Sequence, residues 1–308
     1  MVTNVIRALG TLPSFQNLTR LHFLDVPSSP INLQPLSNLQ KIEISWSRHR
    51  LGQDMFIPAI TSLLARCPSL HELHLDGVYS RDTCTNFSDV FSEVDKLESN
   101  PLPLKSLALY NIAVNPDDIG SRIHHFKDLD FFTILKNPAI HSATAFGEIC
   151  MVLKRHDIYP RCLRTDVVHD PLFFDYLISH PGLHELSIGP GHPLDDSLEL
   201  RREFFEEVLP RHRETLRQLD FVALDATVWS LPLPDNQLTE IARCYKLRTL
   251  AVGIAFEKEE VDRGDTMKPD TWMRIGLQLP ELIFLHMRPC LHLRHSMIAF
   301  TEHQQAVK

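Results

Sequence analysis

The feature of this sequence that most constrains its fold is a short apolar pattern, L-x-x-L-x-L, which recurs along the chain. Isoleucine, valine, phenylalanine or methionine replaces leucine in some copies. The clearest copies begin at residues 39, 70, 104, 183, 216, 247 and 282, and weaker ones begin at 18 and 129. The poorest copy is Leu163-Asp166-Val168, in which a carboxylate occupies an apolar position. Successive copies start about 29 residues apart on average, with wide scatter, which is typical of an irregular array of one repeated unit.

Each copy predicts one short strand, because its last apolar residues alternate with polar ones, as the two faces of a strand require. The predicted strands lie near 18–24, 39–45, 70–76, 104–110, 129–135, 163–169, 183–189, 216–222, 247–253 and 282–288. Segments between them, such as 56–67, 144–156 and 198–212, have apolar residues at helical spacing. Prolines such as Pro68 and Pro181 precede several copies and end the preceding helix.

The period and the alternation of strand with helix predict the fold class: an α/β, irregular leucine-rich-repeat solenoid. We expect residues 1–308 to form a single solenoid of about ten repeats, with a parallel sheet on the concave face and helices on the convex face. The asparagine or cysteine ladder of regular repeats is missing, because the ninth position of three copies is Val78, Ile112 or Gly191.

Composition narrows the function classes. The chain has 308 residues, 44% of them hydrophobic, and a net charge of -8, which argues against a nucleic-acid binder. Arg201 and Arg202 lie among glutamates and indicate a solvated helix face. No apolar run is long enough to span a membrane, and the first residues lack the features of a signal peptide. We therefore expect no membrane partner and a cytoplasmic or nuclear location.

The six cysteines form no C-x-x-C pair, and Cys67 and Cys244 each lie three residues before a strand leucine. Such equivalent positions favour small buried thiols in a reducing compartment. His124-His125 is interpreted as a helix end, where an imidazole complements the helix dipole.

Signals for catalysis and metal binding are weak. His71 and His74 lie three apart on a predicted strand, so they face opposite sides and cannot share an ion. Cys290-x-His292-x-x-His295 has residues suited to zinc but lacks a fourth ligand nearby. No phosphate-binding loop or nucleophile elbow occurs. We expect no enzyme, no cofactor and no metal.

The irregular repeat length and the phrase CPSLHELHL at 67–75 resemble the leucine-rich-repeat region of fungal F-box/LRR-like proteins, over about residues 15–290. The resemblance implies the substrate-recognition part of a ubiquitin-ligase receptor. The F-box itself is not found, since LPSF at 12–15 leads directly into the first copy. A ubiquitin-ligase adaptor is therefore an expected partner only if an F-box lies outside this chain.

Side chains at the third, fifth and seventh positions of each copy are expected on the concave face, where another protein of unknown identity would bind. The expected contact residues are Glu43, Glu72, His74, Asp76, Tyr110, Phe131, Glu185, Asp220, Phe284, His286 and Arg288. A register slip of one residue would instead bury Phe131. The acids Glu43, Glu72 and Asp76 predict a partner with a basic patch.

Alternatives remain open at this point. The chain could be an inhibitor or a structural solenoid unrelated to ubiquitin ligation, and an enzyme is a third hypothesis. The charged segment at 256–269 interrupts the rhythm of helix and strand, so it is a second candidate for partner contacts. Its other interpretation is a disordered surface loop.

Overall fold

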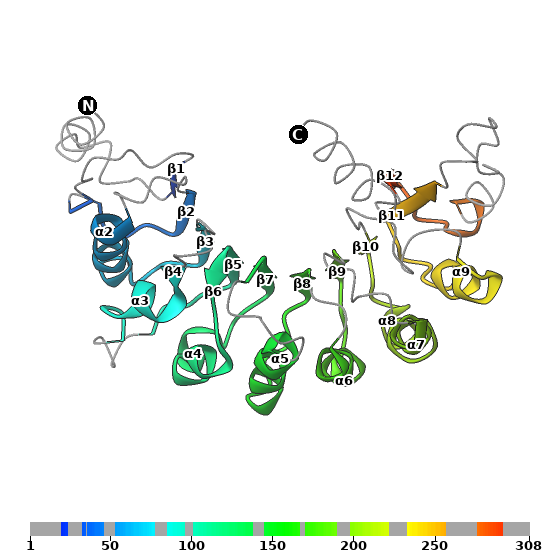
Figure 1. Cartoon of the computed structure of the whole chain (residues 1–308), viewed down its shortest axis with the longest axis horizontal. Helices are drawn as coiled ribbons and strands as arrows, with labels where there is room; N and C mark the ends of the chain where they lie inside the picture. Colours follow the sequence, from blue (N-terminus) through cyan, green and yellow to red (C-terminus); the bar gives the residue numbers. More distant parts are fainter. Residues whose placement is uncertain are drawn as a thin grey trace, which may run out of the picture. The chain divides into compact units, whose positions relative to one another are not determined.

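The structure is a computed structural model that describes residues 20–23, 33–34, 36–45, 53–77, 85–95, 101–137, 145–166, 170–189, 198–221, 233–256 and 276–291. The chain divides into two compact units, Met1–Pro160 and Arg161–Lys308. In each unit, short parallel strands alternate with helices, and the helices lie on one side of the strands (Figure 1).

The first unit contains a parallel sheet built from five strands. These are β1 (Arg20–Phe23), β2 (Lys41–Ser45), β3 (Glu72–Asp76), β5 (Ser106–Tyr110) and β7 (Phe131–Leu135). Their register aligns Leu21, Ile42, Leu73, Leu107 and Phe132 in one row. Two shorter strands, β4 (Thr85–Asn86) and β6 (Ile112–Ala113), pair with each other outside this sheet.

The helical segments of the first unit follow the strands in the chain. They are α2 (Gln53–Ala65), α3 (Phe87–Phe91), α4 (Pro116–Ser121), the 3-10 turn Ile123–His125 and α5 (Ala145–Arg155). Asn115 begins α4 with a reciprocal capping box to Asp118, and Pro116 supplies a first helical residue that needs no backbone donor.

The second unit repeats this arrangement. Its sheet consists of β8 (Cys162–Thr165), β9 (Glu185–Ile188), β10 (Gln218–Phe221), β11 (Thr249–Phe256) and β12 (Phe284–Leu291). Leu163, Leu186, Leu219, Leu250 and Leu285 form the equivalent row. The helices are α6 (Pro171–Ser179), α7 (Leu198–Glu203), the π-helical turn Phe204–Val208, α8 (Leu209–His212) and α9 (Asp235–Ala242).

The core of each unit lies between its sheet and its helices. Strand residues alternate between buried and half-exposed, and Ile42, Ile44 and Leu75 are fully buried. Phenylalanines from the helical side complete the core, as Phe87, Phe91, Phe126, Phe173, Phe174, Phe204 and Phe205 do. The predicted α/β class and the parallel pairing of the strands are confirmed.

The predicted copy that begins at Leu163 is misaligned. Strand β8 pairs Leu163 with Leu186, so Leu163 occupies the second apolar position of its copy and not the first. The copy therefore begins at Pro160, and Pro160, Leu163 and Thr165 are all buried. Asp166 comes after the strand, and residues 167–169 of the expected strand lie outside the described residues. A proline and a threonine fill apolar positions here, which hides the copy from a search for leucines.

One copy does have an asparagine at the ninth position, unlike the three copies compared in the sequence. Asn137 occupies the ninth position after Leu129, and its side chain is 8% exposed. Its Oδ1 accepts from the Val114 amide at 3.1 Å, and its Nδ2 donates to the Val114 carbonyl at 2.9 Å. The side chain thus ties one strand-to-helix connection to the connection before it.

Within the described residues, the helices are too short or too polar for any of them to cross a membrane.

Candidate protein-binding surface

The face of the first sheet that points away from the helices is called here the open face of the first unit. It consists of Lys41, Glu43, Ser45, Glu72, His74, Asp76, Ser106, Ala108, Tyr110, Phe131, Thr133 and Leu135, all half-exposed or exposed. Phe131 is 44% exposed and Phe132 is 1% exposed, so β7 adopts the register that displays Phe131. The alternative register, which would bury Phe131, is not the one observed.

An aromatic pair lies at the centre of this open face. The rings of His74 and Tyr110 stack with centroids 4.8 Å apart and planes inclined by 24°. His74 also faces Glu43 across the β2–β3 register, with its Nδ1 3.6 Å from the carboxylate Oε1. Three neighbouring strands therefore hold one another's side chains in place, which lowers the entropy that a partner must remove on binding.

The acids on this face are already engaged within the sheet. Lys41 Nζ lies 2.9 Å from Glu72 Oε2. Asp76 accepts hydrogen bonds from Ser45 Oγ at 3.3 Å and Asn111 Nδ2 at 3.0 Å. Because the Lys41 ammonium offsets Glu72, the face is less acidic than the carboxylates alone suggest. The pairing follows from the register between strands, which a single strand's sequence does not reveal.

The open face of the second unit carries the other expected residues. Glu185 and Asp220 are half-buried on β9 and β10, and the exposed rings of Phe284 and His286 on β12 stack at 6.1 Å. Arg288 follows them on β12, paired in register with Gly253. The ring pair and these two carboxylates come from different strands of the same sheet.

Sequence reasoning missed one exposed cation on this face. Arg164 on β8 lies opposite Ser187 of β9 and is exposed. The misaligned copy at Leu163 placed Arg164 at the second position, whereas the correct register places it at the fifth. A search that accepts proline and threonine at apolar positions would have found it.

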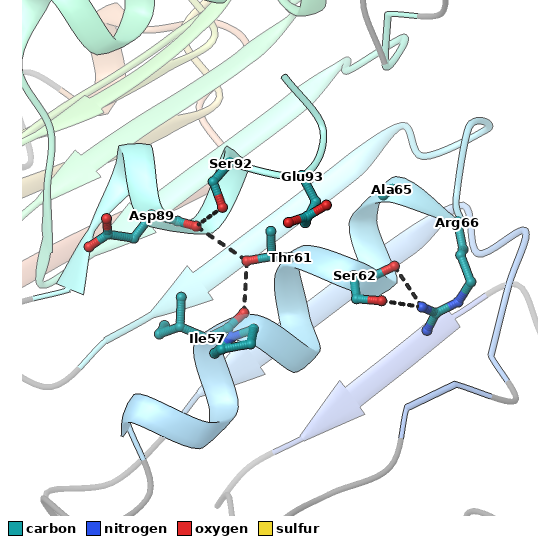
Figure 2. A pocket seen from close by; sticks show the side chains of 9 residues that line it. Ile57, Thr61, Ser62, Ala65, Arg66, Asp89, Ser92 and Glu93 are labelled. Atoms are coloured by element: carbon teal, nitrogen blue, oxygen red, sulfur yellow. Dashed lines mark hydrogen bonds between the residues drawn. The ribbon is translucent and has the colours of Figure 1, made fainter. Parts of the chain in front are cut away.

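A groove of about 710 Å³ lies between α2 and α3 on the helical side of the first unit (Figure 2). The Thr61 hydroxyl on its floor is 2.8 Å from the Ile57 carbonyl oxygen and 3.2 Å from that of Asp89. Arg66 Nη1 donates to the carbonyl and hydroxyl of Ser62. The Thr61 hydroxyl and the Arg66 guanidinium thus form hydrogen bonds within the lining of the groove.

A buried histidine joins neighbouring repeats in the first unit. His125 accepts a hydrogen bond at Nδ1 from the Leu102 amide at 2.8 Å. Burial, helped by neighbouring His124, lowers the pKa of His125 to about 4. His125 ends a 3-10 turn, so the predicted helix end is confirmed, but a neutral imidazole does not complement a helix dipole as a cation would. It is 1% exposed and neutral, and it serves as a buried acceptor for a backbone amide.

Three of the cysteines in the described segments are buried thiols. Cys67, Cys150 and Cys244 are unpaired and fully buried. Burial raises the pKa of Cys67, and burial together with Glu240 raises the pKa of Cys244 to about 12. The predicted burial of Cys67 and Cys244 is confirmed. Such thiols are poor nucleophiles, because the thiolate is the reactive form.

No group of three potential metal ligands occurs among the residues that the structure describes. His292 and His295 lie outside those residues, so the Cys290 cluster stays a sequence observation. The same is true of the segment 256–269 beyond Phe256.

Comparison with known proteins adds no assignment: no protein-family model matches the chain, and no significant match is found among curated proteins or solved structures.

Proposed function

We propose that this chain is a leucine-rich-repeat protein that binds another protein through the open faces of its sheets. The observation that carries the proposal is the surface formed by Glu43, His74, Tyr110 and Phe131. It combines the exposed ring of Phe131 and the half-exposed rings of His74 and Tyr110 with charge on regular strands. Aromatic residues are enriched where proteins bind one another.

The repeat assignment is supported by the strand register. In both units, the apolar positions of successive copies align in rows, as Leu73 aligns with Leu107 and Leu186 with Leu219. Each strand is followed by a connection or helix on one side of the sheet (Figure 1). A unit of this kind buries its apolar face only by stacking on its neighbours.

The partner that we propose carries a basic side chain directed at Glu43. Glu43 is half-exposed on β2 and lies beside the His74–Tyr110 pair, with its carboxylate Oε1 3.6 Å from His74 Nδ1. An arginine or lysine from a partner would place its charge beside Glu43 and its aliphatic stem over the His74–Tyr110 pair.

The resemblance to F-box/LRR-like proteins further suggests a substrate receptor of a ubiquitin ligase. This part of the proposal rests on resemblance alone. Affinity purification of the full-length gene product tests it: recovery of the ligase adaptor or cullin supports a receptor. Recovery of a partner without either would favour an inhibitor or scaffold outside ubiquitin ligation.

The open-face site is tested by removing its exposed aromatic surface. In a quantitative pull-down with tagged chain, Tyr110→Ala plus Phe131→Ala is expected to reduce partner recovery at least about tenfold, since anchor residues contribute 2 kcal/mol or more. Phe131 is already exposed, so its truncation leaves little cavity.

Leu198→Ala is the matched control, because Leu198 on α7 is an apolar side chain with 61% exposure on the helical side. Its recovery of partner should equal that of the wild type. Undiminished recovery by the double variant, with unchanged circular dichroism, would reject the open face of the first unit as the binding surface.

A further inference from the structure

A second groove lies on the helical side of the second unit, apart from that unit's open face. It separates the segment Phe204–His212 from α9 and is lined by Phe205, Glu206, Pro210, Arg213, Gln237 and Glu240, among others. Its volume is about 280 Å³. A single water needs only about 10–15 Å³ of such space. The space is too large for one bridging water and just below the size of ordinary small-molecule pockets.

The floor of the groove contains a side-chain amide without a partner. Gln237 in the first turn of α9 is 5% exposed, and its Oε1 is buried and accepts no hydrogen bond. No hydrogen bond joins its Nε2 to another of the described residues either. A buried acceptor left unpaired costs about 1–3 kcal/mol. Gln237 lines the groove, and an unpaired polar group kept at that cost indicates that something outside the fold bonds to it.

The opposite wall contains the π-helical turn. Pro210 has no backbone N–H, so it cannot donate to the Glu206 carbonyl as an α-helix requires. The Leu209 amide instead donates to Phe204, five residues earlier, which is the bonding of a π turn. Such turns occur frequently at functional sites. This observation is independent of the unpaired amide and concerns the same groove.

Two arginines of the described residues, Arg213 and Arg243, line the groove, and they differ in their ion pairs. Arg243 is paired with Glu240, and Glu206 lies 3.8 Å from Arg202. Arg213 is exposed and forms no ion pair with any carboxylate in the described segments. A guanidinium in this state can take a carboxylate through two parallel hydrogen bonds.

We propose that this groove binds a short extended peptide segment that carries an aspartate or glutamate. The carboxamide of Gln237 has one donor group and one acceptor, as a peptide unit has, so the two can pair side by side. Arg213 holds the acidic side chain, and Phe205 and Pro210 form the apolar wall. The site is separate from the open faces, and its test does not depend on them.

The proposal is tested by monitoring the NMR signal of the Gln237 side-chain amide during a peptide titration. Full-length chain labelled with ¹⁵N-glutamine is titrated with acetyl-Asp-Gly-amide, and the side-chain NH₂ signal is assigned by its loss in Gln237→Met. We expect a saturable shift of that signal in the millimolar range. Acetyl-Asn-Gly-amide should bind about tenfold more weakly, because it keeps the peptide unit but loses the charge.

Variants separate the two contacts. Arg213→Gln should abolish the preference for the aspartyl peptide over the asparaginyl one. Gln237→Met should weaken the binding of both peptides about tenfold or more. Binding to this variant is measured by saturation transfer to the peptide. Gln218→Met, a matched change on the open face, should leave binding unchanged. An equal shift with sodium acetate alone, or no shift at saturating peptide, would overturn the proposal and leave water as the occupant.

Discussion

At the scale of single residues, buried histidines hold the turns between repeats together. His212 is 1% exposed, its Nδ1 accepts from the Leu183 amide at 3.4 Å and its Nε2 lies 3.0 Å from the Leu177 carbonyl. Burial first, and then the neighbouring His180, lower the pKa of His212 to about 4. The imidazole is therefore neutral in the folded chain at neutral pH and bridges two successive connections.

This geometry predicts a loss of stability in mild acid. The unfolded chain gains a proton at His212 below its ordinary pKa of 6.5, whereas the folded chain resists protonation until about pH 4. The unfolded state thus binds more protons in this window, and the free energy of unfolding falls as the pH drops from 6.5 towards 4. His212→Gln should reduce the loss between pH 7 and pH 5 by about 1–2 kcal/mol, as measured by urea unfolding.

His212→Gln also removes a backbone contact, which lowers its stability at every pH. The quantity to compare is therefore the change in its free energy of unfolding between pH 7 and pH 5. Val208→Ala, which truncates a fully buried side chain nearby in sequence, should lower stability equally at both pH values. If wild type and His212→Gln lost the same free energy between the two pH values, this explanation would be wrong.

At the scale of elements, neighbouring repeats are joined by side chains that reach backbone groups. Asn137 bonds both the amide and the carbonyl of Val114, while Arg66 Nη2 donates to the Leu33 carbonyl at 2.8 Å. Arg122 holds Asp95 through two hydrogen bonds, with Nε–Oδ1 at 2.9 Å. These contacts connect elements that the strand ladder does not join.

Asn137→Ala tests one such connection. It removes both partners of a buried backbone unit, so we expect a loss of about 2–4 kcal/mol in the free energy of unfolding. Asn137→Asp keeps the acceptor for the Val114 amide but loses the donor and adds a charge. Chemical denaturation should show both variants to be destabilised, and a change below 0.5 kcal/mol for Asn137→Ala would contradict the assigned role.

The sequence predicted those elements in which leucines occupy every apolar position. Copies such as Leu70-Leu73-Leu75 identify a strand because the alternation is local. The copy at Pro160 was missed because proline and threonine occupy two of the positions at which the pattern requires leucine or a similar residue. Contacts such as Lys41–Glu72 depend on register, and the amide of Gln237 became notable only when its surroundings left it unpaired. Such features arise between segments distant in the chain, so no single segment encodes them.

At the scale of the whole molecule, apolar surface is concentrated near the last described strand. Leu277, Ile283 and Met287 are 85%, 66% and 49% exposed. On other strands the position equivalent to Met287 is buried, as Val252 is at 1%. An apolar surface beside a terminal strand favours association between molecules.

We therefore expect the purified chain to associate in a concentration-dependent way, and Leu277→Gln plus Ile283→Lys to suppress this. Both side chains are exposed, so the double variant should keep the melting temperature of the wild type within a few degrees. Light scattering coupled to size exclusion measures the effect. Equal association of the variant and the wild type would exclude this surface as its cause.

The constant strand register has a further consequence for how such a chain can change. The copies are separated by segments of very different length, yet each strand pairs with the next in the same register. Strand spacing is fixed at about 4.8 Å by backbone hydrogen bonds. Insertions and deletions between strands therefore alter the helical side. They do not change the distance between neighbouring side chains on the open face. Evolution can therefore change the helical side of the sheet while the spacing between side chains on the open face stays the same.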